Sequence, residues 1–183
     1  MATATPTNQP TRLLTVKLRL SNLLAFLVFI LFLYCFIDFL HGDINKANII
    51  IHVDQHDSNQ VHLAGLIDFG VMVQGPGVLD LAILAIAIFH MNRPHGADLL
   101  HIVRLILQSY HAGGVILGQR DLELLYHALP ARCSQIIVAC SYDALKDPDN
   151  SKYILGGVNN SLLTIRHIYS MYSKAEFIKG IMY

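Results

Sequence analysis

The stretch HGDINKAN, residues 41–48, determines how this chain folds and acts, together with IDFG at residues 67–70 and DLA at residues 80–82. Each motif alone is short enough to occur by chance, but the three stand in order along one part of the chain. The segments Ile49–Val53 and 61–67 are β-branched or aliphatic, and the polar, turn-rich segment DQHDSNQ separates them. This pattern predicts a β-hairpin that brings the end of the first motif to the start of the second.

Three side chains in these motifs are of the types that phosphoryl transfer needs. The reaction requires an acceptor for the proton of the attacking hydroxyl, and oxygen ligands that hold Mg²⁺ against the phosphates. Asp43 supplies a carboxylate at the start of the loop, while Asn48 and Asp68 supply the hard oxygen atoms that Mg²⁺ prefers. Gly42 and Gly70 permit tight backbone turns beside them. The hairpin therefore predicts one site that contains all three side chains.

Three further residues of this region have two interpretations each. His41 is either a buried, hydrogen-bonded scaffold residue or an acid/base, and we favour the scaffold because Asp43 already supplies a base. Asp80 is either an ordinary acid in the first turn of a helix or a support for the loop, and the residues alone leave both interpretations open. Lys46 either approaches a phosphate or is an exposed loop lysine, and the sequence does not decide between these two.

The segments HGDINKANIII and HLAGLIDFG resemble the aminoglycoside phosphotransferase superfamily, which includes the choline, homoserine and hydroxylysine kinases. The similarity to the hydroxylysine kinase branch continues through ARCSQIIVACSYDALKDPDNSKYIL and covers residues 39–171. A hairpin followed by helices is an α+β arrangement. The resemblance implies that this is the C-terminal lobe of a protein kinase-like domain, mostly helical, with a catalytic β-hairpin.

The resemblance also implies the roles of the motif residues. Asp43 would be the catalytic base, Asn48 and Asp68 would bind the Mg²⁺ cofactor, and His41 and Asp80 would support the loop. The implied reaction transfers the γ-phosphoryl group of GTP or ATP to the hydroxyl of 5-hydroxylysine or a similar small amino alcohol. One departure stands after IDFG, where the family usually has a second Asp and this chain has Val71. We expect the metal site to survive this change and the support around it to differ.

A larger departure concerns the nucleotide-binding lobe. Kinases of this class have an N-terminal lobe with a strand lysine and a loop that covers the phosphates. Residues 1–38 contain no Gly-rich loop, so we expect the N-lobe to be absent. We then expect residues 1–38 to be an atypical N-terminal segment and residues 39–183 to be the C-lobe. Two hypotheses follow: a kinase fragment of very low activity, or a pseudokinase-like or membrane-tethered module that binds partners.

The apolar run LLAFLVFILFLYCFI, residues 23–37, has four interpretations. A buried helix followed by a strand fits its length best. A membrane span needs about 20 apolar residues, so this run is short for one. A signal peptide would show a small-residue cleavage site, which FIDFLHGD does not contain. Finally, codons with uracil at the second position encode Phe, Leu, Ile, Met and Val. A pyrimidine tract before a splice acceptor would therefore have this composition if it were translated. In that case the segment would be a translated intron and not native sequence.

The helices predicted after the hairpin are mostly apolar. We expect them at residues 78–91, 97–111, 121–144 with a kink or break at Pro130, and 151–174. The first is apolar almost all round, which predicts deep burial. The turn residues in VMVQGPG, residues 71–77, predict a loop before it.

Bulk composition restricts the partners. Thirteen basic residues balance thirteen acidic ones, so no net charge favours nucleic acid or an anionic membrane. The three cysteines show no CxxC spacing, which is typical of a reducing compartment, and we expect a cytoplasmic protein. The expected partner is a small-molecule substrate, and the sequence gives no oligomeric state.

Overall fold

The computed structural model describes residues 37–53 and 61–182, which belong to one compact unit. Of the apolar run at residues 23–37, all but the last residue lies outside the described residues, so its four interpretations stay predictions. Within the described residues, no helix combines the length and apolar character that a membrane crossing requires.

The strands form two small antiparallel sheets. Strand β2 (Ile49–Val53) pairs with β3 (Val61–Leu66), which confirms the predicted hairpin, and the register shifts between Ile50 and Ile51. Strand β1 (Ile37–Leu40) pairs with β4 (Val73–Pro76). The prediction of a loop throughout residues 71–77 was therefore wrong. Each strand of this second sheet has only one partner, and the missing N–H of a proline is tolerated on such an edge.

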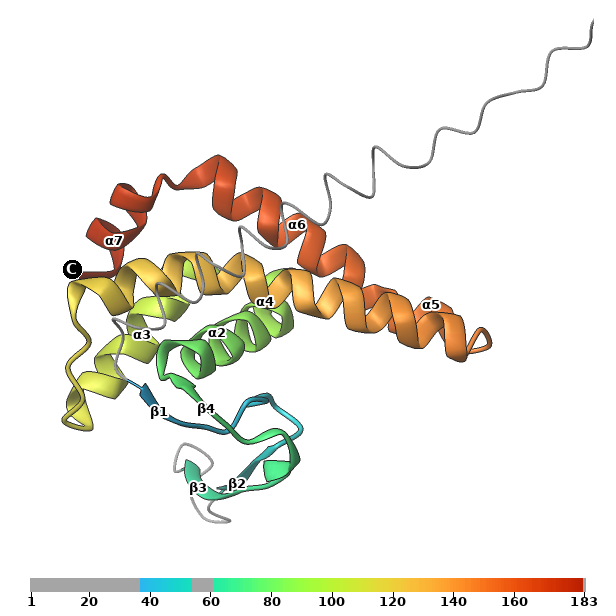
Figure 1. The fold of residues 1–183 in the computed structure, drawn as a ribbon, viewed down its shortest axis with the longest axis horizontal. Coiled ribbons are helices and arrows are strands. Elements are labelled where there is room, and N and C mark those ends of the chain that lie inside the picture. The colour runs from blue at the N-terminus through green and yellow to red at the C-terminus, as the bar shows by residue number, and fades with distance from the viewer. Residues whose placement is uncertain (1–36, 54–60, 183) are drawn as a thin grey trace, which may run out of the picture. The chain divides into compact units, whose positions relative to one another are not determined.

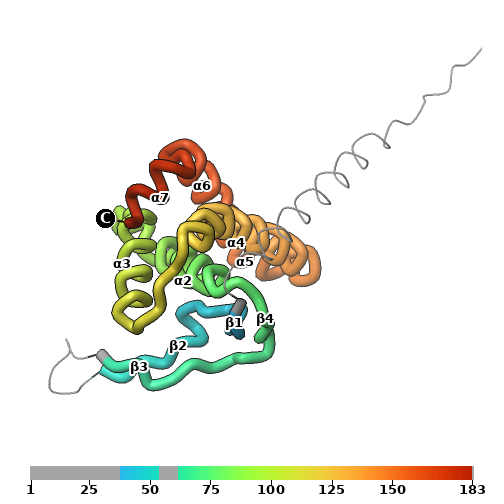
Figure 2. The backbone as a smooth tube through the Cα atoms, turned by 60° about the vertical axis from the view of Figure 1, so that its left-hand side comes forward, coloured from blue at the N-terminus to red at the C-terminus, as the bar shows by residue number. Residues whose placement is uncertain are grey.

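Helices follow the strands and make the structure mostly helical, an α+β arrangement. The bounds are α2 (Val78–Asn92), α3 (Leu99–Ala112), α4 (Gln119–Lys146), α5 (Ser151–Ile154), α6 (Gly156–Met171) and α7 (Lys174–Met182), with short 3-10 turns η1 (Phe69–Val71) and η2 (Arg93–His95). Figure 1 shows α4 between α2 and α3 on one side and α6 and α7 on the other. The strands lie on the α2 side of these helices (Figure 1 and Figure 2).

Two helix predictions need correction. Helix α4 continues through Pro130, so the predicted break does not occur. Proline removes one backbone hydrogen bond within a helix, but Pro130 is buried, and the packing around it stabilises the helical backbone. The single helix predicted for residues 151–174 is instead α5, α6 and the start of α7. Leu155 separates the first two, and Tyr172 adopts an extended conformation at the end of α6.

The core is centred on α2 and α4. Helix α2 buries side chains around much of its circumference, as its apolar sequence predicted. Helix α4 contacts α2, α5, α6 and α7, and it presents Leu125, Leu129 and Cys133 as a fully buried row at intervals of four residues. Burial raises the pKa of the Cys133 thiol to about 12. This row couples the central helix to the rest of the core.

The packing of α4 predicts a large difference between two leucines of the same helix. Leu129 is fully buried, whereas Leu145 is 80% exposed. We expect Leu129→Ala to lower the free energy of unfolding by about 2–5 kcal/mol, because it removes buried methyl groups and leaves a cavity. Urea denaturation followed by circular dichroism measures the change. The matched control, Leu145→Ala, should change it little, and equal losses for the two variants would contradict the assigned core.

Candidate active site

Asp80 holds the start of the HGDINKAN loop. It lies in the first turn of α2, and its carboxylate accepts hydrogen bonds from the backbone N–H of His41 at 2.7 Å and of Gly42 at 2.9 Å. Each bond uses a different carboxylate oxygen. Hydrogen bonds to an ionised acceptor are among the strongest that proteins form. The first turn of α2 therefore fixes the position at which the loop enters the site. This arrangement agrees with the supporting role expected for Asp80.

His41 joins the loop to the end of β3. Its Nε2 lies 2.9 Å from the carbonyl oxygen of Ile67, which can only accept, so Nε2 must carry the hydrogen. Its Nδ1 then accepts from the backbone N–H of Asp43 at 3.4 Å. The ring is buried and packs against Phe69, with centroids 4.8 Å apart. Both nitrogens are occupied within the fold, which favours the scaffold interpretation over an acid/base.

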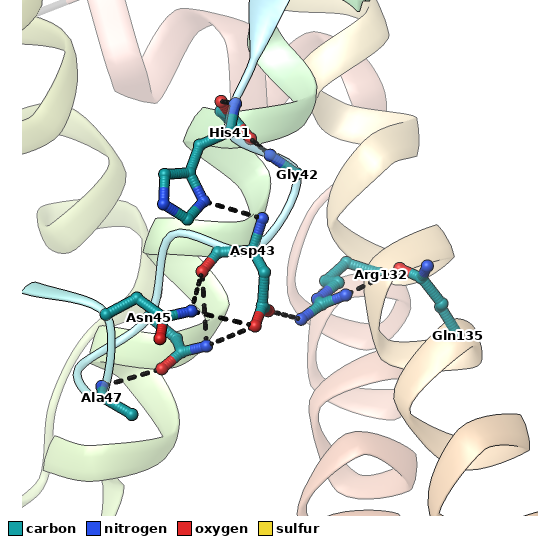
Figure 3. Close-up of polar contacts among 9 residues, drawn as sticks. His41, Gly42, Asp43, Asn45, Ala47, Arg132 and Gln135 are labelled. Carbon is teal, nitrogen blue, oxygen red and sulfur yellow. Dashed lines mark hydrogen bonds and ion pairs between the residues drawn. The ribbon is translucent and has the colours of Figure 1, made fainter. Parts of the chain in front are cut away.

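The carboxylate of Asp43 is surrounded by hydrogen-bond donors. One oxygen accepts from Asn45 at 2.8 Å and from Asn48 at 3.1 Å, and the other forms an ion pair with Arg132 at 3.0 Å. Figure 3 shows Arg132 reaching from α4 across to the loop, with Gln135 beside it. The guanidinium also donates to Gln135 at 2.8 Å. Two donors from the loop and one from α4 thus orient the Asp43 carboxylate, which is still partly exposed.

Asn48 and Asp68 lie next to each other across the hairpin. The backbone N–H of Ile67 donates to the carbonyl of Asn48 at 3.0 Å, which places Asp68 one residue beyond this contact. The side-chain NH₂ of Asn48 donates to Asp43, and its amide oxygen makes no hydrogen bond among the described residues. The exposed carboxylate of Asp68 is likewise without a hydrogen bond in the described part of the chain. Two oxygen ligands are therefore left for a cation.

The backbone at Asp68 is unusual. With φ 63° and ψ 62° it is left-handed, and it is the one non-glycine residue with positive φ among those described. Such strain is typical of functional sites. Gly42 also has a positive φ, 81°, and a Cβ there would lie 2.6 Å from the carbonyl oxygen of Val71. The segment after Asp68 therefore packs directly on the loop, through both the backbone and the side chain of Val71.

The donor set suits Mg²⁺ better than zinc. In the described part of the chain, no three His, Cys, Asp or Glu residues are grouped so that they could hold a metal ion. Mg²⁺ usually keeps several waters and takes one or two carboxylates together with substrate phosphates. Asp68 and the amide oxygen of Asn48 fit this requirement.

The structure thus joins four of the site residues selected from the sequence, His41, Asp43, Asn48 and Asp80, through hydrogen bonds within the loop and to α2. The fifth, Asp68, follows Ile67, whose backbone is bonded to Asn48. Lys46 is exposed and makes no hydrogen bond or ion pair among the described residues. Asn45 also bonds to Asp43, although the motif pattern did not single it out within the loop. Arg132 had no local pattern that could indicate its role, because it lies 89 residues from Asp43.

Comparison with protein-family models, with curated proteins and with solved structures returns no match in any of the three. The function must therefore be argued from the residues and their geometry.

The anchoring of the loop by Asp80 can be tested with Asp80→Asn. The new amide offers one acceptor and one NH₂, so one of the two backbone N–H groups would face a donor. We expect a loss of about 1–3 kcal/mol in the free energy of unfolding, the cost of an unsatisfied buried group. Amide hydrogen exchange at His41 and Gly42 should become faster.

The matched control is Asp149→Asn, which makes the same change at an exposed aspartate. It should leave both measurements unchanged. If exchange at His41 and Gly42 stays slow in Asp80→Asn, the loop is held by other contacts and the anchor is wrongly assigned.

Proposed function

We propose that the described residues form the catalytic lobe of a small-molecule kinase, acting in the cytoplasm. It would transfer the γ-phosphoryl group of GTP or ATP to the hydroxyl of 5-hydroxylysine or a similar amino alcohol. The observation that supports this proposal best is the oriented carboxylate of Asp43, bonded to Asn48, with Asp68 adjacent across the hairpin. The motif resemblance supports the choice of substrates.

The reaction assigns a step to each group. Asp43 accepts a hydrogen bond from the acceptor hydroxyl and takes its proton as the hydroxyl oxygen forms a bond to the γ-phosphorus. The bond from that phosphorus to the bridging oxygen breaks, and its electron pair leaves with the nucleoside diphosphate. Arg132, Asn45 and Asn48 keep the Asp43 carboxylate in one orientation, which is the positioning that this kind of transfer depends on.

Asn48 and Asp68 would hold Mg²⁺, which when bound offsets the negative charge of the phosphates. The Asn48 side chain has two roles in this arrangement, because its NH₂ bonds to Asp43 while its oxygen is left for the cation. The base and the metal would thus be connected through one amide group.

A second candidate function is that of a pseudokinase-like or membrane-tethered interaction module without catalysis. It is favoured by apolar side chains at the surface of the strands, where Phe39 is 72%, Ile51 58% and Leu63 66% exposed among the described residues. The oxygen atoms left at Asn48 and Asp68 favour the kinase, because an interaction module has no need of them.

A single-turnover assay tests the kinase proposal, with the full chain in excess over labelled GTP or ATP and 5-hydroxylysine as acceptor. We expect Mg²⁺-dependent transfer far slower than the about 1–100 s⁻¹ typical of kinases, because the described residues include no lobe that covers a triphosphate. Asp68→Asn should abolish this transfer more completely than Asp43→Asn, since it removes charge that holds the metal. Asp149→Asn is the control, and transfer that survives Asp68→Asn would contradict the assignment.

A further inference from the structure

A cavity of about 660 Å³ is lined by residues of β1, α2 and α3, together with Ile44 of the HGDINKAN loop. Small-molecule sites typically enclose about 300–1,000 Å³, so the cavity is large enough for a metabolite. Its lining includes Asp80, which anchors the loop, but not Asp43, Asn48 or Asp68. The cavity is therefore separate from the candidate base and metal ligands, although it shares the acid that holds the loop.

The polar groups of the lining gather at one end of the cavity. A Cβ on Gly77 would lie 3.9 Å from the hydroxyl oxygen of Tyr110, which places this hydroxyl at the start of α2. Asp80 lies in the first turn of the same helix. Burial, and then the negative charges of Asp38 and Asp80, raise the pKa of Tyr110. This end of the cavity therefore combines two carboxylates with a neutral hydroxyl.

The lining becomes apolar with distance from this end. Leu84 and Ile88 continue the wall along α2, and Leu105 and Ile106 lie on α3, before Tyr110. Asp80 and Ile88 are two turns apart, about 12 Å along the helix axis. The cavity therefore has a charged end and an apolar length that suits a hydrocarbon chain.

The negative charge of the lining has no basic partner in the cavity. Asp38 accepts a hydrogen bond from the backbone N–H of Phe39 at 2.7 Å and forms no ion pair among the described residues. No described residue that lines the cavity is a lysine, arginine or histidine. A hydrated metal ion would make no use of the apolar wall, and the described residues offer no group of three acids, cysteines or histidines to hold one. An organic cation with an apolar part fits both features.

We propose that this cavity binds an amphipathic amine, with its ammonium at Asp38, Asp80 and Tyr110 and its hydrocarbon part between α2 and α3. The Asp80 carboxylate holds the backbone N–H groups of His41 and Gly42, and a neighbouring ammonium favours its ionised form. Binding therefore stabilises the HGDINKAN loop. The amine is a regulator and not the phosphoryl acceptor, and its binding does not rest on the proposed kinase function.

Isothermal titration calorimetry of the full chain at neutral pH tests the proposal with n-octylamine, n-octanol, octanoate and n-butylamine as probes. We expect protonated octylamine to bind about tenfold or more tightly than octanol, because only the amine makes charge-assisted contacts. Octanoate should bind more weakly than octanol, since its charge has the same sign as the lining. Butylamine is four methylene groups shorter and should bind on the order of a hundredfold more weakly than octylamine.

Asp38→Asn removes one of the two carboxylates and leaves the anchor at Asp80 in place. It should lower the affinity for octylamine about tenfold and leave the affinity for octanol unchanged. Asp149→Asn, the same change at an exposed aspartate outside the cavity lining, should alter neither affinity. Thermal unfolding shows that both variants are folded. Equal binding of octylamine and octanol, or an unchanged octylamine affinity in Asp38→Asn, would overturn the proposal.

NMR of the full chain locates the amine and measures its effect on the loop. Octylamine should shift the methyl signals of Leu84 and Ile88 and slow amide hydrogen exchange at His41 and Gly42. Binding that leaves exchange at both amides unchanged would overturn the proposal. If no probe binds, a polypeptide covers the cavity and the proposal is equally overturned. Methyl signals that then shift with protein concentration would identify this polypeptide as a second copy of the chain.

Discussion

The geometry of the site depends on the two hydrogen bonds that the Asp80 carboxylate accepts from the backbone of His41 and Gly42. They fix the loop to the first turn of α2, and α2 is itself the most apolar element of the core. From this point the loop positions Asp43, whose backbone N–H is bonded to the His41 ring. Asp80 thus links the packing of the helices to the position of Asp43.

Helix α4 makes the second link between core and site. The buried row that includes Leu129 and Cys133 fixes the helix, and Arg132, next to Cys133, reaches out to Asp43. Changes in core packing along α4 should therefore alter the position of Arg132 and, through it, the orientation of the Asp43 carboxylate.

Local patterns in the sequence predicted much of this structure. Two β-branched or aliphatic segments separated by a polar, turn-rich segment predicted the β2–β3 hairpin, which the structure confirms. This hairpin and the motif order predicted that Asp43, Asn48 and Asp68 lie in one site. Local patterns could not indicate contacts between residues that are far apart in the sequence. The residues of β4 were predicted to be a loop because their partner strand β1 lies far away in the sequence. Nothing in the sequence around Arg132 indicates its contact with Asp43. At Pro130 a kink or a break was predicted, and the break does not occur because tertiary packing keeps α4 helical.

The central claim is that this loop and hairpin form a phosphoryl-transfer site. The most direct test is paramagnetic NMR with Mn²⁺, which shares the oxygen preference of Mg²⁺. Titrated into the full chain, Mn²⁺ should broaden the amide signals of Asn48 and Asp68 first. The exposed acids Asp147 and Asp149 are an internal comparison on the same spectrum. Broadening that is strongest at Asp147 and Asp149, with Asn48 and Asp68 unaffected, would contradict the account.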